Sequence, residues 1–337
     1  MKILQITYSD RGSEAAENAL CLHRAFRKIG TGSVLLAARK YTREAGVELI
    51  PGRWGRFWDG LLGKDLENRP SGLPQIARSY KADAIILHDI SGGVASVEEI
   101  AQLPGKLFRV LHNETVFPDE KEPLFQKKCE FWGKLPMTLV APTSGMAQKA
   151  ENGAVFCGME QIRIPFGVDL SIYHPGNREK VRRELGIPSD VFAVLTNPMQ
   201  NQTVCKTLCE LKKIYGSKIR FIHSMPRSRE AVVRLYQACD LLLDGSMLIN
   251  TPYHILRASA CGLPVAAFNF GGMTETVADG WSGRLSPPDD PEALTEAVCD
   301  ILENTAFFRD GACEHAAASF ADMTIARRYC DWVNKVL

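Results

Sequence analysis

Short hydrophobic runs alternate with helical stretches along the whole chain. In the first half, the runs that predict buried strands cover 2–7, 33–38, 84–89, 107–112, 138–142 and 161–165. The stretch between the first two runs has helical periodicity, begins at the N-cap residue Ser13 and ends at Gly30. Fully apolar strands joined by helical crossovers predict a parallel sheet with both faces covered.

A second series follows a segment rich in proline, glycine and charge at 165–190. Its predicted strands are 192–196, 219–223, 241–244, 264–268 and 282–286, and its clearest helices are 203–216, 229–240 and 251–262. Three further helical stretches close the chain. Two Rossmann-like halves joined by a linker predict a cleft between them, and ligands of open parallel sheets bind beyond the carboxyl ends of the strands. Residues 39–70 fit no clear strand or helix pattern.

Composition narrows the class of protein. The 337 residues are 45% hydrophobic and 23% charged, as in an ordinary globular chain of about two domains. A net charge of +1 without a basic stripe argues against a nucleic-acid binder. The ten cysteines show no zinc spacing and favour free thiols in a reducing cytosol. The N-terminus is typical of a strand and no apolar run approaches ~18 residues, so we expect a cytoplasmic protein.

The stretch around 250–275 is typical of a site for a phosphorylated ligand. Thr251 suits an N-cap and Pro252 the first helical position, so the main-chain N–H groups at 250–253 can hold an anion. The alternative is plain helix-start chemistry with no ligand. Gly271 and Gly272 follow the strand 264–268 and open a second helix, which places two helix starts at one sheet edge and favours the anion site.

Three residues near the strand ends of the first half are further candidates. Gly12 lies in a strand-to-helix turn, where a glycine lets main chain approach a ligand closely. His112 ends one strand and His88 another, each where a cleft residue belongs. For His112 a functional and a structural role are both open, whereas for His88 a structural role is the simpler interpretation.

In the second half, Asp289 and Asp290 indicate a capped helix start, and we expect no metal site.

At this point the sequence resembles a known family. The segment 235–295 looks like the donor-binding half of retaining GT-B glycosyltransferases of family 4. The segments 162–176 and 320–337 resemble that family's linker and its closing helix. The segments 9–26 and 88–113 are similar to members that build exopolysaccharide and lipopolysaccharide.

The resemblance implies an α/β protein of GT-B fold, with two Rossmann-like domains facing across a cleft. Residues 1–168 would form the acceptor-binding domain, 169–320 the donor-binding domain, and the C-terminal helix 321–337 would cross back to the N-terminal domain. The substrates would be a nucleotide-diphosphate sugar and a glycan or lipid-linked acceptor, with no metal and no other cofactor. His112 would lie near the transferred sugar and Gly12 would face the diphosphate. The residues around the donor would be Asn250, Thr251, Gly271, Gly272 and Glu275.

The donor half departs from the family pattern at several positions. Ile249 and Arg257 stand where two glutamates eight positions apart are usual, and Pro198 with polar neighbours stands where an arginine and a lysine are usual. Arg257 exchanges a hydroxyl acceptor for a fixed cation, which can hold a phosphate. Arg227 and Arg229 are further candidates for that role. For all three arginines the alternative is surface solvation or an ion pair.

Basic and aromatic residues mix in the unpatterned stretch, which suits an interfacial segment on lipid headgroups. They are Arg53, Trp54, Arg56, Phe57 and Trp58. The alternative is a loop whose aromatic residues pack over the acceptor site. Two functions therefore stand side by side. One is a glycosyltransferase for cell-surface polysaccharide, cytoplasmic or peripheral at the inner face of the membrane. The other is a catalytically degenerate GT-B module that acts as partner or scaffold of another glycosyltransferase.

Overall fold

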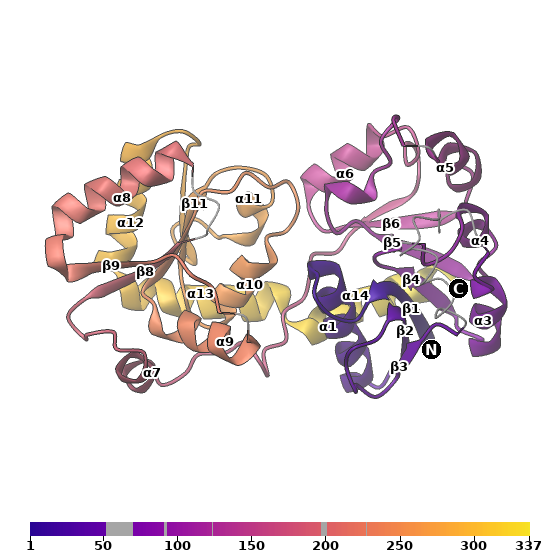
Figure 1. Cartoon of the computed structure of the whole chain (residues 1–337), viewed down its shortest axis with the longest axis horizontal. Helices are drawn as coiled ribbons and strands as arrows, with labels where there is room; N and C mark the ends of the chain where they lie inside the picture. Colours follow the sequence, from indigo (N-terminus) through magenta and orange to yellow (C-terminus); the bar gives the residue numbers. More distant parts are fainter. Residues whose placement is uncertain (52–69, 91–92, 123, 197–200, 227) are drawn as a thin grey trace, which may run out of the picture. The chain divides into compact units, whose positions relative to one another are not determined.

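The computed structural model describes residues 1–51, 70–90, 93–122, 124–196, 201–226 and 228–337 (Figure 1). The chain forms two compact units. Unit 1 comprises Met1–Gly167 together with Asp322–Leu337, and unit 2 comprises Val168–Ala321. These bounds lie one residue from the domain limits expected from the sequence, and the closing helix belongs to unit 1.

Unit 1 is built on a seven-stranded sheet with the order β3-β2-β1-β4-β5-β6-β7, and every neighbouring pair is parallel. Its strands are β1 (Lys2–Ser9), β2 (Gly32–Arg39), β3 (Val47–Leu49), β4 (Ala84–Leu87), β5 (Lys106–Val110), β6 (Met137–Ala141) and β7 (Gln161–Arg163). Every strand predicted in this half is confirmed. The edge strand β3 was missed, because only Val47 of its three residues is buried and no alternation marks it.

Helices cover the sheet of unit 1. They are α1 (Glu14–Lys28), α3 (Leu73–Tyr80), α4 (Val97–Ala101), α5 (Phe125–Trp132), α6 (Ser144–Glu151) and α14 (Asp322–Val336). Ser13 caps α1 as predicted, since its hydroxyl accepts from the Ala16 N–H at 3.1 Å. The closing helix α14 packs against α1, where Lys28 Nζ lies 2.8 Å from Asp322 Oδ2. None of the described helices is long and apolar enough to cross a membrane.

Unit 2 has a five-stranded parallel sheet with the order β12-β11-β10-β8-β9. Its strands are β8 (Phe192–Thr196), β9 (Ile219–Ile222), β10 (Leu241–Asp244), β11 (Val265–Phe268) and β12 (Gly283–Ser286). Its helices are α7 (Arg178–Glu184), α8 (Gln202–Tyr215), α9 (Arg229–Ala238), α10 (Tyr253–Ala260), α11 (Met273–Thr276), α12 (Pro291–Glu303) and α13 (Thr305–Phe320). The predicted strands of this half are confirmed as well.

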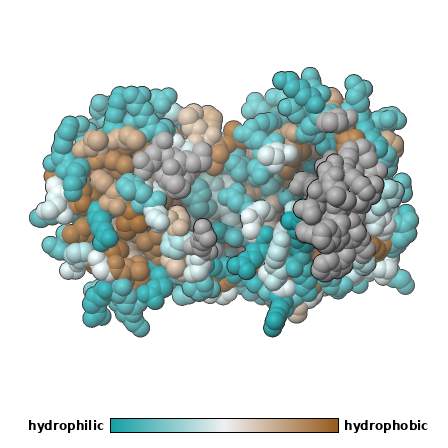
Figure 2. Space-filling model, in the orientation of Figure 1, coloured by the Kyte–Doolittle hydropathy of each residue, from teal (hydrophilic) through white to brown (hydrophobic). Residues whose placement is uncertain are grey.

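The core of unit 2 lies between its sheet and the helices α8 and α12. Val194, Leu211, Phe268 and Leu294 are among its fully buried members. Half-buried aromatic residues extend this core toward the surface, and Figure 2 shows hydrophobic patches among hydrophilic residues on the visible face of unit 2. Burial of this apolar surface is the main source of the unit's stability.

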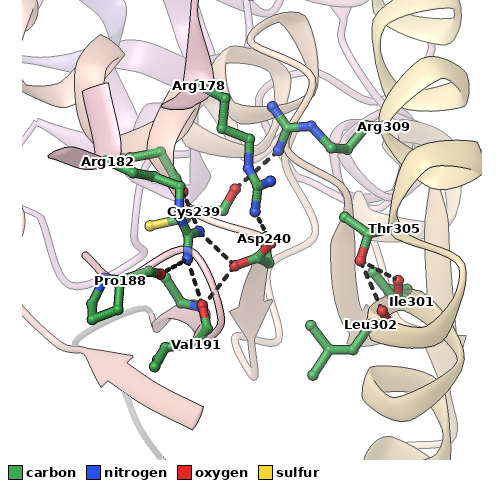
Figure 3. Close-up of polar contacts among 12 residues, drawn as sticks. Arg178, Arg182, Pro188, Val191, Cys239, Asp240, Ile301, Leu302, Thr305 and Arg309 are labelled. Carbon is green, nitrogen blue, oxygen red and sulfur yellow. Dashed lines mark hydrogen bonds and ion pairs between the residues drawn. The ribbon is translucent and has the colours of Figure 1, made fainter. Parts of the chain in front are cut away.

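A buried carboxylate ties the amino ends of two strands of unit 2 to α7 (Figure 3). Asp240, which precedes β10, accepts hydrogen bonds from Arg178, from Arg182 at 3.0 Å and from the Ala193 N–H at 2.7 Å. Arg182 and Asp240 are each only 4% exposed. Arg309 reaches in from α13 to donate to the Cys239 carbonyl at 2.9 Å. Further hydrogen bonds offset the cost of burying this charge pair, because Arg182 also donates to three main-chain carbonyls.

Candidate functional site

Two buried histidines meet at the carboxyl ends of adjacent strands in unit 1. His88 follows β4 and His112 follows β5, and His88 Nδ1 lies 3.1 Å from His112 Nε2. The His112 ring also stacks on Phe166, with ring centroids 5.2 Å apart. The predicted placement of both histidines at strand ends is therefore confirmed, and the two form one pair, which the sequence did not predict.

Burial keeps both histidines neutral near pH 7. It lowers the pKa of His88 to about 3. It also lowers the pKa of His112 well below its usual value, and the neighbouring His88 and Arg109 lower it further. A neutral imidazole has one N–H donor and one acceptor nitrogen, so each ring can pass a hydrogen bond in only one direction.

A cavity of about 410 Å³ lies beside His88 at this edge of the sheet, within the range of small-ligand sites. Its polar lining includes Asp89, Arg109, Thr115 and Lys128. Arg109 is 4% exposed and its guanidinium lies 5.0 Å from the centre of the Trp132 ring. The cavity thus combines fixed cations, carboxylates and an aromatic wall, which is suited to a polar organic ligand.

Gly12 leaves open space at the end of β1. Its φ is +94°, and a Cβ added there would meet no atom within 4 Å. The loop that holds it is anchored, because the buried carboxylate of Asp10 accepts from the main-chain N–H groups of Tyr41 at 2.8 Å and Thr42 at 2.9 Å. The local geometry therefore permits the close approach of a ligand that the sequence predicted, while the role of Gly12 stays a prediction.

Polar side chains also end the strands of unit 2, and the sequence interpretation missed them. Asp244 ends β10, is fully buried and contacts His254 Nε2 from α10. Thr196 ends β8, and its hydroxyl lies 2.6 Å from Nδ1 of His223 after β9. A signal was present, since the predicted strands 192–196, 219–223 and 241–244 each end in a polar residue, at the edge where ligands of parallel sheets bind.

The start of α10 differs from the prediction. The helix begins at Tyr253 with Pro252 in the N-cap position, and no side chain caps it. Thr251 was predicted as the N-cap, which is wrong. Its side chain is buried, with 1% of the residue exposed. Within the described residues, the hydroxyls of Thr251 and of Ser246 on the same loop are buried without a hydrogen-bond partner.

The glycine pair Gly271–Gly272 opens a second helix, as predicted, while its anion-binding role stays a prediction. The helix α11 has only four residues, and its first N–H groups already have protein partners. The Gly272 N–H donates to the Leu248 carbonyl at 2.9 Å, and the Glu275 N–H donates to Gly272 at 3.4 Å. The two glycines also allow close packing, since a Cβ on Gly271 would lie 2.2 Å from the Leu248 carbonyl oxygen.

The guanidinium of Arg257 packs on two aromatic rings. It lies 4.1 Å from the centre of the Tyr253 ring and 5.2 Å from that of Tyr173. This cation–π packing was not among the alternatives considered from the sequence. Arg229 is exposed at the first position of α9, and Glu275 is half-buried on α11.

Several candidates lie outside the described residues. These are Arg53, Trp54, Arg56, Phe57, Trp58, Pro198 and Arg227. Over the ranges that the structure does describe, no group of three or more His, Cys, Asp or Glu side chains could hold a metal ion.

A comparison with known protein families gives a match that lies entirely within unit 2. Residues 196–304 match the family described as "Glycosyl transferases group 1". The D-inositol 3-phosphate glycosyltransferase of Mycolicibacterium smegmatis is 28% identical over 182 residues, which cover 45% of this chain and 42% of that protein. The chain therefore spans less than half the length of this curated relative.

Solved structures match the whole chain. A glycosyltransferase from Rickettsia africae has a TM-score of 0.71 at 14% identity and covers 99% of this chain and 98% of its own. Anabaena Alr3699/HepE, solved with UDP and glucose, has a TM-score of 0.70 at 17% identity, with 99% and 100% covered. The pneumococcal O-GlcNAc transferase GtfA, solved with UDP and GlcNAc, has a TM-score of 0.66 at 12% identity, with 100% and 99% covered. The predicted GT-B fold of two Rossmann-like domains is confirmed.

Proposed function

We propose that the protein is a retaining glycosyltransferase that moves a sugar from a nucleotide-diphosphate sugar to a glycan or lipid-linked acceptor in cell-surface polysaccharide synthesis. The proposal rests on one observation, that the family match and a cluster of buried polar residues lie in the same part of unit 2. The match covers residues 196–304, and within that range a buried acid, a histidine and two buried hydroxyls gather between β10 and α10. Fold alone would not support an activity, whereas this cluster lies at the sheet edge where ligands bind.

In the donor half, the diphosphate would lie against the start of α10. The helix dipole and the cation of Arg257 would stabilise its charge, and no metal would be required. Thr251 and Ser246 would turn their hydroxyls to the ligand, which would satisfy groups that have no partner among the described residues. In this proposal Arg257, which stands where the family carries an acid, neutralises part of the diphosphate charge. The donor site is therefore altered rather than lost.

In the acceptor half, His112 would line the reaction centre and Gly12 would let main chain approach the diphosphate. The cavity beside His88 would hold part of the acceptor, with Arg109 and Lys128 as the cations that recognise a phosphate or acidic sugar. A phosphorylated acceptor is included because the curated relatives carry D-inositol 3-phosphate in their names. The retaining outcome follows the family resemblance and is tested by the anomeric configuration of the product.

Thermal unfolding with a panel of ligands tests the donor. UDP, GDP, ADP, CMP and the corresponding sugar nucleotides are added at increasing concentration, and we expect one base to raise the Tm specifically. If no nucleotide of the panel raises the Tm, the donor site is rejected. The alternative function is then favoured, a degenerate module that serves as partner of another glycosyltransferase. With the donor identified, the same assay with D-inositol 3-phosphate or lipid-linked sugars tests the acceptor.

Membrane contact is a separate part of the proposal and rests on the sequence alone. Basic and aromatic residues at 53–58 would place the protein at the inner face of the cell membrane. Flotation with anionic liposomes tests this, with the Trp54→Ala/Trp58→Ala double variant as the matched comparison. Absence of wild-type protein from the liposome fraction would reject membrane contact and leave the sugar-transfer proposal untouched.

A further inference from the structure

Two arginines of unit 2 reach the same short segment at the amino end of β10 (Figure 3). Arg178 comes from α7 and donates to the Asp240 carboxylate, and Arg309 comes from α13 and donates to the Cys239 carbonyl at 2.9 Å. The side chain of Arg178 is 34% exposed and Arg309 is half-buried, so solvent reaches this place. A guanidinium stays charged and can only donate, which fixes the direction of every hydrogen bond that the two arginines make.

Positive charge exceeds negative charge in this cluster. Arg182 is the second cation from which Asp240 accepts a hydrogen bond, at 3.0 Å. In the ranges that the structure describes, Arg178 and Arg182 form no other ion pair and Arg309 forms none. Three guanidiniums therefore gather around a single carboxylate.

The other titratable groups near the two arginines supply no counter-charge. Burial raises the pKa of the Cys239 thiol to about 12 and also raises the pKa of the Cys313 thiol, so both thiols are neutral near pH 7. Glu179 and Asp310 follow the two arginines in the chain, but both acids are exposed. Neither acid pairs with an arginine in the part of the chain that the structure describes.

The two arginines also have many N–H groups that no described residue accepts from, unlike Arg182. Arg182 is 4% exposed and makes four hydrogen bonds, to Asp240 and to three main-chain carbonyls. Arg178 and Arg309 each make a single hydrogen bond to described residues, although a guanidinium has five N–H donors. Among these residues, Nε of Arg178 and Nε of Arg182 are buried without a partner. Arg182 thus serves the fold, whereas the donors of Arg178 and Arg309 suit a ligand.

The guanidiniums of Arg178 and Arg309 are close enough to repel each other. Burial lowers the pKa of Arg309, and the Arg178 cation then lowers this pKa more than the Asp240 carboxylate raises it. The two cations stay together because Asp240 holds one and the Cys239 carbonyl holds the other. An anion that contacts both cations would replace this repulsion by attraction.

We propose that Arg178 and Arg309 form a binding site for a phosphate group, either inorganic phosphate or a small phosphate monoester. A phosphate carries about −1.5 to −2 charges near pH 7, which matches the excess charge of the cluster. Its several oxygens can accept from two guanidiniums at once, each of which presents a planar fork of donors.

This phosphate site is distinct from the proposed donor site. It lies at the amino end of β10, whereas the donor site lies beyond Asp244 at the carboxyl end of the same strand. The length of the strand separates the two places by about 13 Å. The phosphate site therefore does not rest on the proposed function.

Nitrogen NMR of the arginine Nε–H groups tests the site. The ¹⁵N-labelled protein is titrated with sodium phosphate at constant ionic strength, and Arg178→Lys and Arg309→Lys spectra assign the two signals. We expect both signals to shift and to saturate together. Arg234 is the internal control, because its side chain is also exposed, at 44%, and pairs with Glu184 outside the cluster. A response of both signals that does not saturate, or that equals the response of Arg234, would mean an adventitious ion only and overturn the proposal.

The Arg309→Gln variant tests the second cation, since glutamine keeps a donor for the Cys239 carbonyl and leaves Asp240 with both of its arginines. The phosphate concentration at half-saturation, read from the Arg178 signal, should rise about tenfold or more. An unchanged midpoint in folded Arg309→Gln protein would overturn the two-arginine site. Thermal unfolding verifies that the variant is folded, and the wild-type titration decides whether phosphate binds without it.

Two further titrations locate the phosphate and identify its source. Arg257→Glu alters the proposed donor site and should leave the Arg178 response unchanged. Loss of that response in Arg257→Glu, together with its retention in Arg309→Gln, would place the phosphate at α10 and overturn the proposal. Glycerol 3-phosphate distinguishes the two sources, because a lower midpoint than that of inorganic phosphate assigns a monoester and a higher midpoint assigns inorganic phosphate.

Discussion

The carbonyl oxygen of Asn250 occupies the place of the side chain that Gly272 lacks, since a Cβ there would lie 1.9 Å away from it. Gly272 thus lets the loop after β11 pack on the loop before α10, main chain against main chain. The glycine pair that predicted a phosphate site therefore has a packing reason of its own. It still bears on the site, because this contact positions the residues around Thr251.

The Gly272→Ala variant should accordingly be strongly destabilised. The obstacle is main chain rather than a flexible side chain, so the loops must separate, and we expect a loss of about 3 kcal/mol or more in the free energy of unfolding. Urea denaturation measures this loss. Gly32→Ala is the control, because its Cβ would meet its nearest atom at an ordinary 3.4 Å. Similar losses in the two variants would show that the 1.9 Å contact is relieved in solution.

The buried His88 should make the folded protein sensitive to acid. In the unfolded chain the His88 imidazole binds a proton below its usual pKa of 6.5. In the folded chain its pKa is lowered to about 3, so it stays neutral until the pH falls that far. The free energy of unfolding should therefore fall as the pH falls through this window, by up to about 1.4 kcal/mol per pH unit from this one group.

The His88→Gln variant isolates this contribution, because a glutamine at 88 does not titrate. Its pH dependence between 6.5 and 3 should be flatter than that of the wild type, even if its stability at pH 7 is lower. The exposed His174, replaced in the same way, is the comparison and should leave the slope unchanged. Parallel slopes for wild type and His88→Gln would contradict the burial of a neutral imidazole.

Asp240 should be essential to the stability of unit 2. The Asp240→Asn variant leaves Arg178 and Arg182 without their carboxylate, and breaking a buried pair by removing one partner costs about 3–5 kcal/mol. Chemical denaturation followed by circular dichroism checks this. Glu210→Gln is the control, because it removes only the exposed pair with Lys213, whose side chains are 51% and 70% exposed, and it should leave the stability nearly unchanged. Equal effects would mean that the Asp240 cluster is solvated.

The hydrophobic pattern predicted the strands of both sheets because buried parallel strands need uninterrupted apolar runs, as in 84–87 and 241–244. It could not predict β3, an edge strand with a single buried residue, or that α10 begins at Tyr253 without a side-chain cap. The His88–His112 pair also required the strand order, since the two residues lie 24 positions apart and meet only because β4 and β5 are neighbours. The polar residues that end several predicted strands, Asp244 above all, could be identified from the sequence.

Arg257 provides the sharpest test of the altered donor site. If its guanidinium binds the diphosphate, Arg257→Glu both removes a charged hydrogen bond, worth about 1.5–3 kcal/mol, and places a repelling carboxylate there. Nucleotide affinity, measured by titration calorimetry or thermal shift, should fall about tenfold or more. Arg183→Glu changes the net charge equally on the exposed side of α7 and should leave the affinity unchanged. Arg257→Lys separates the two contributions of the residue, since lysine keeps the cation but lacks the planar group that packs on Tyr253 at 4.1 Å. An equal or higher affinity in Arg257→Glu would contradict a phosphate contact at position 257. It would indicate that this position contacts a hydroxyl of the donor, as an acid would, and that the role of the arginine is to pack on the two tyrosines.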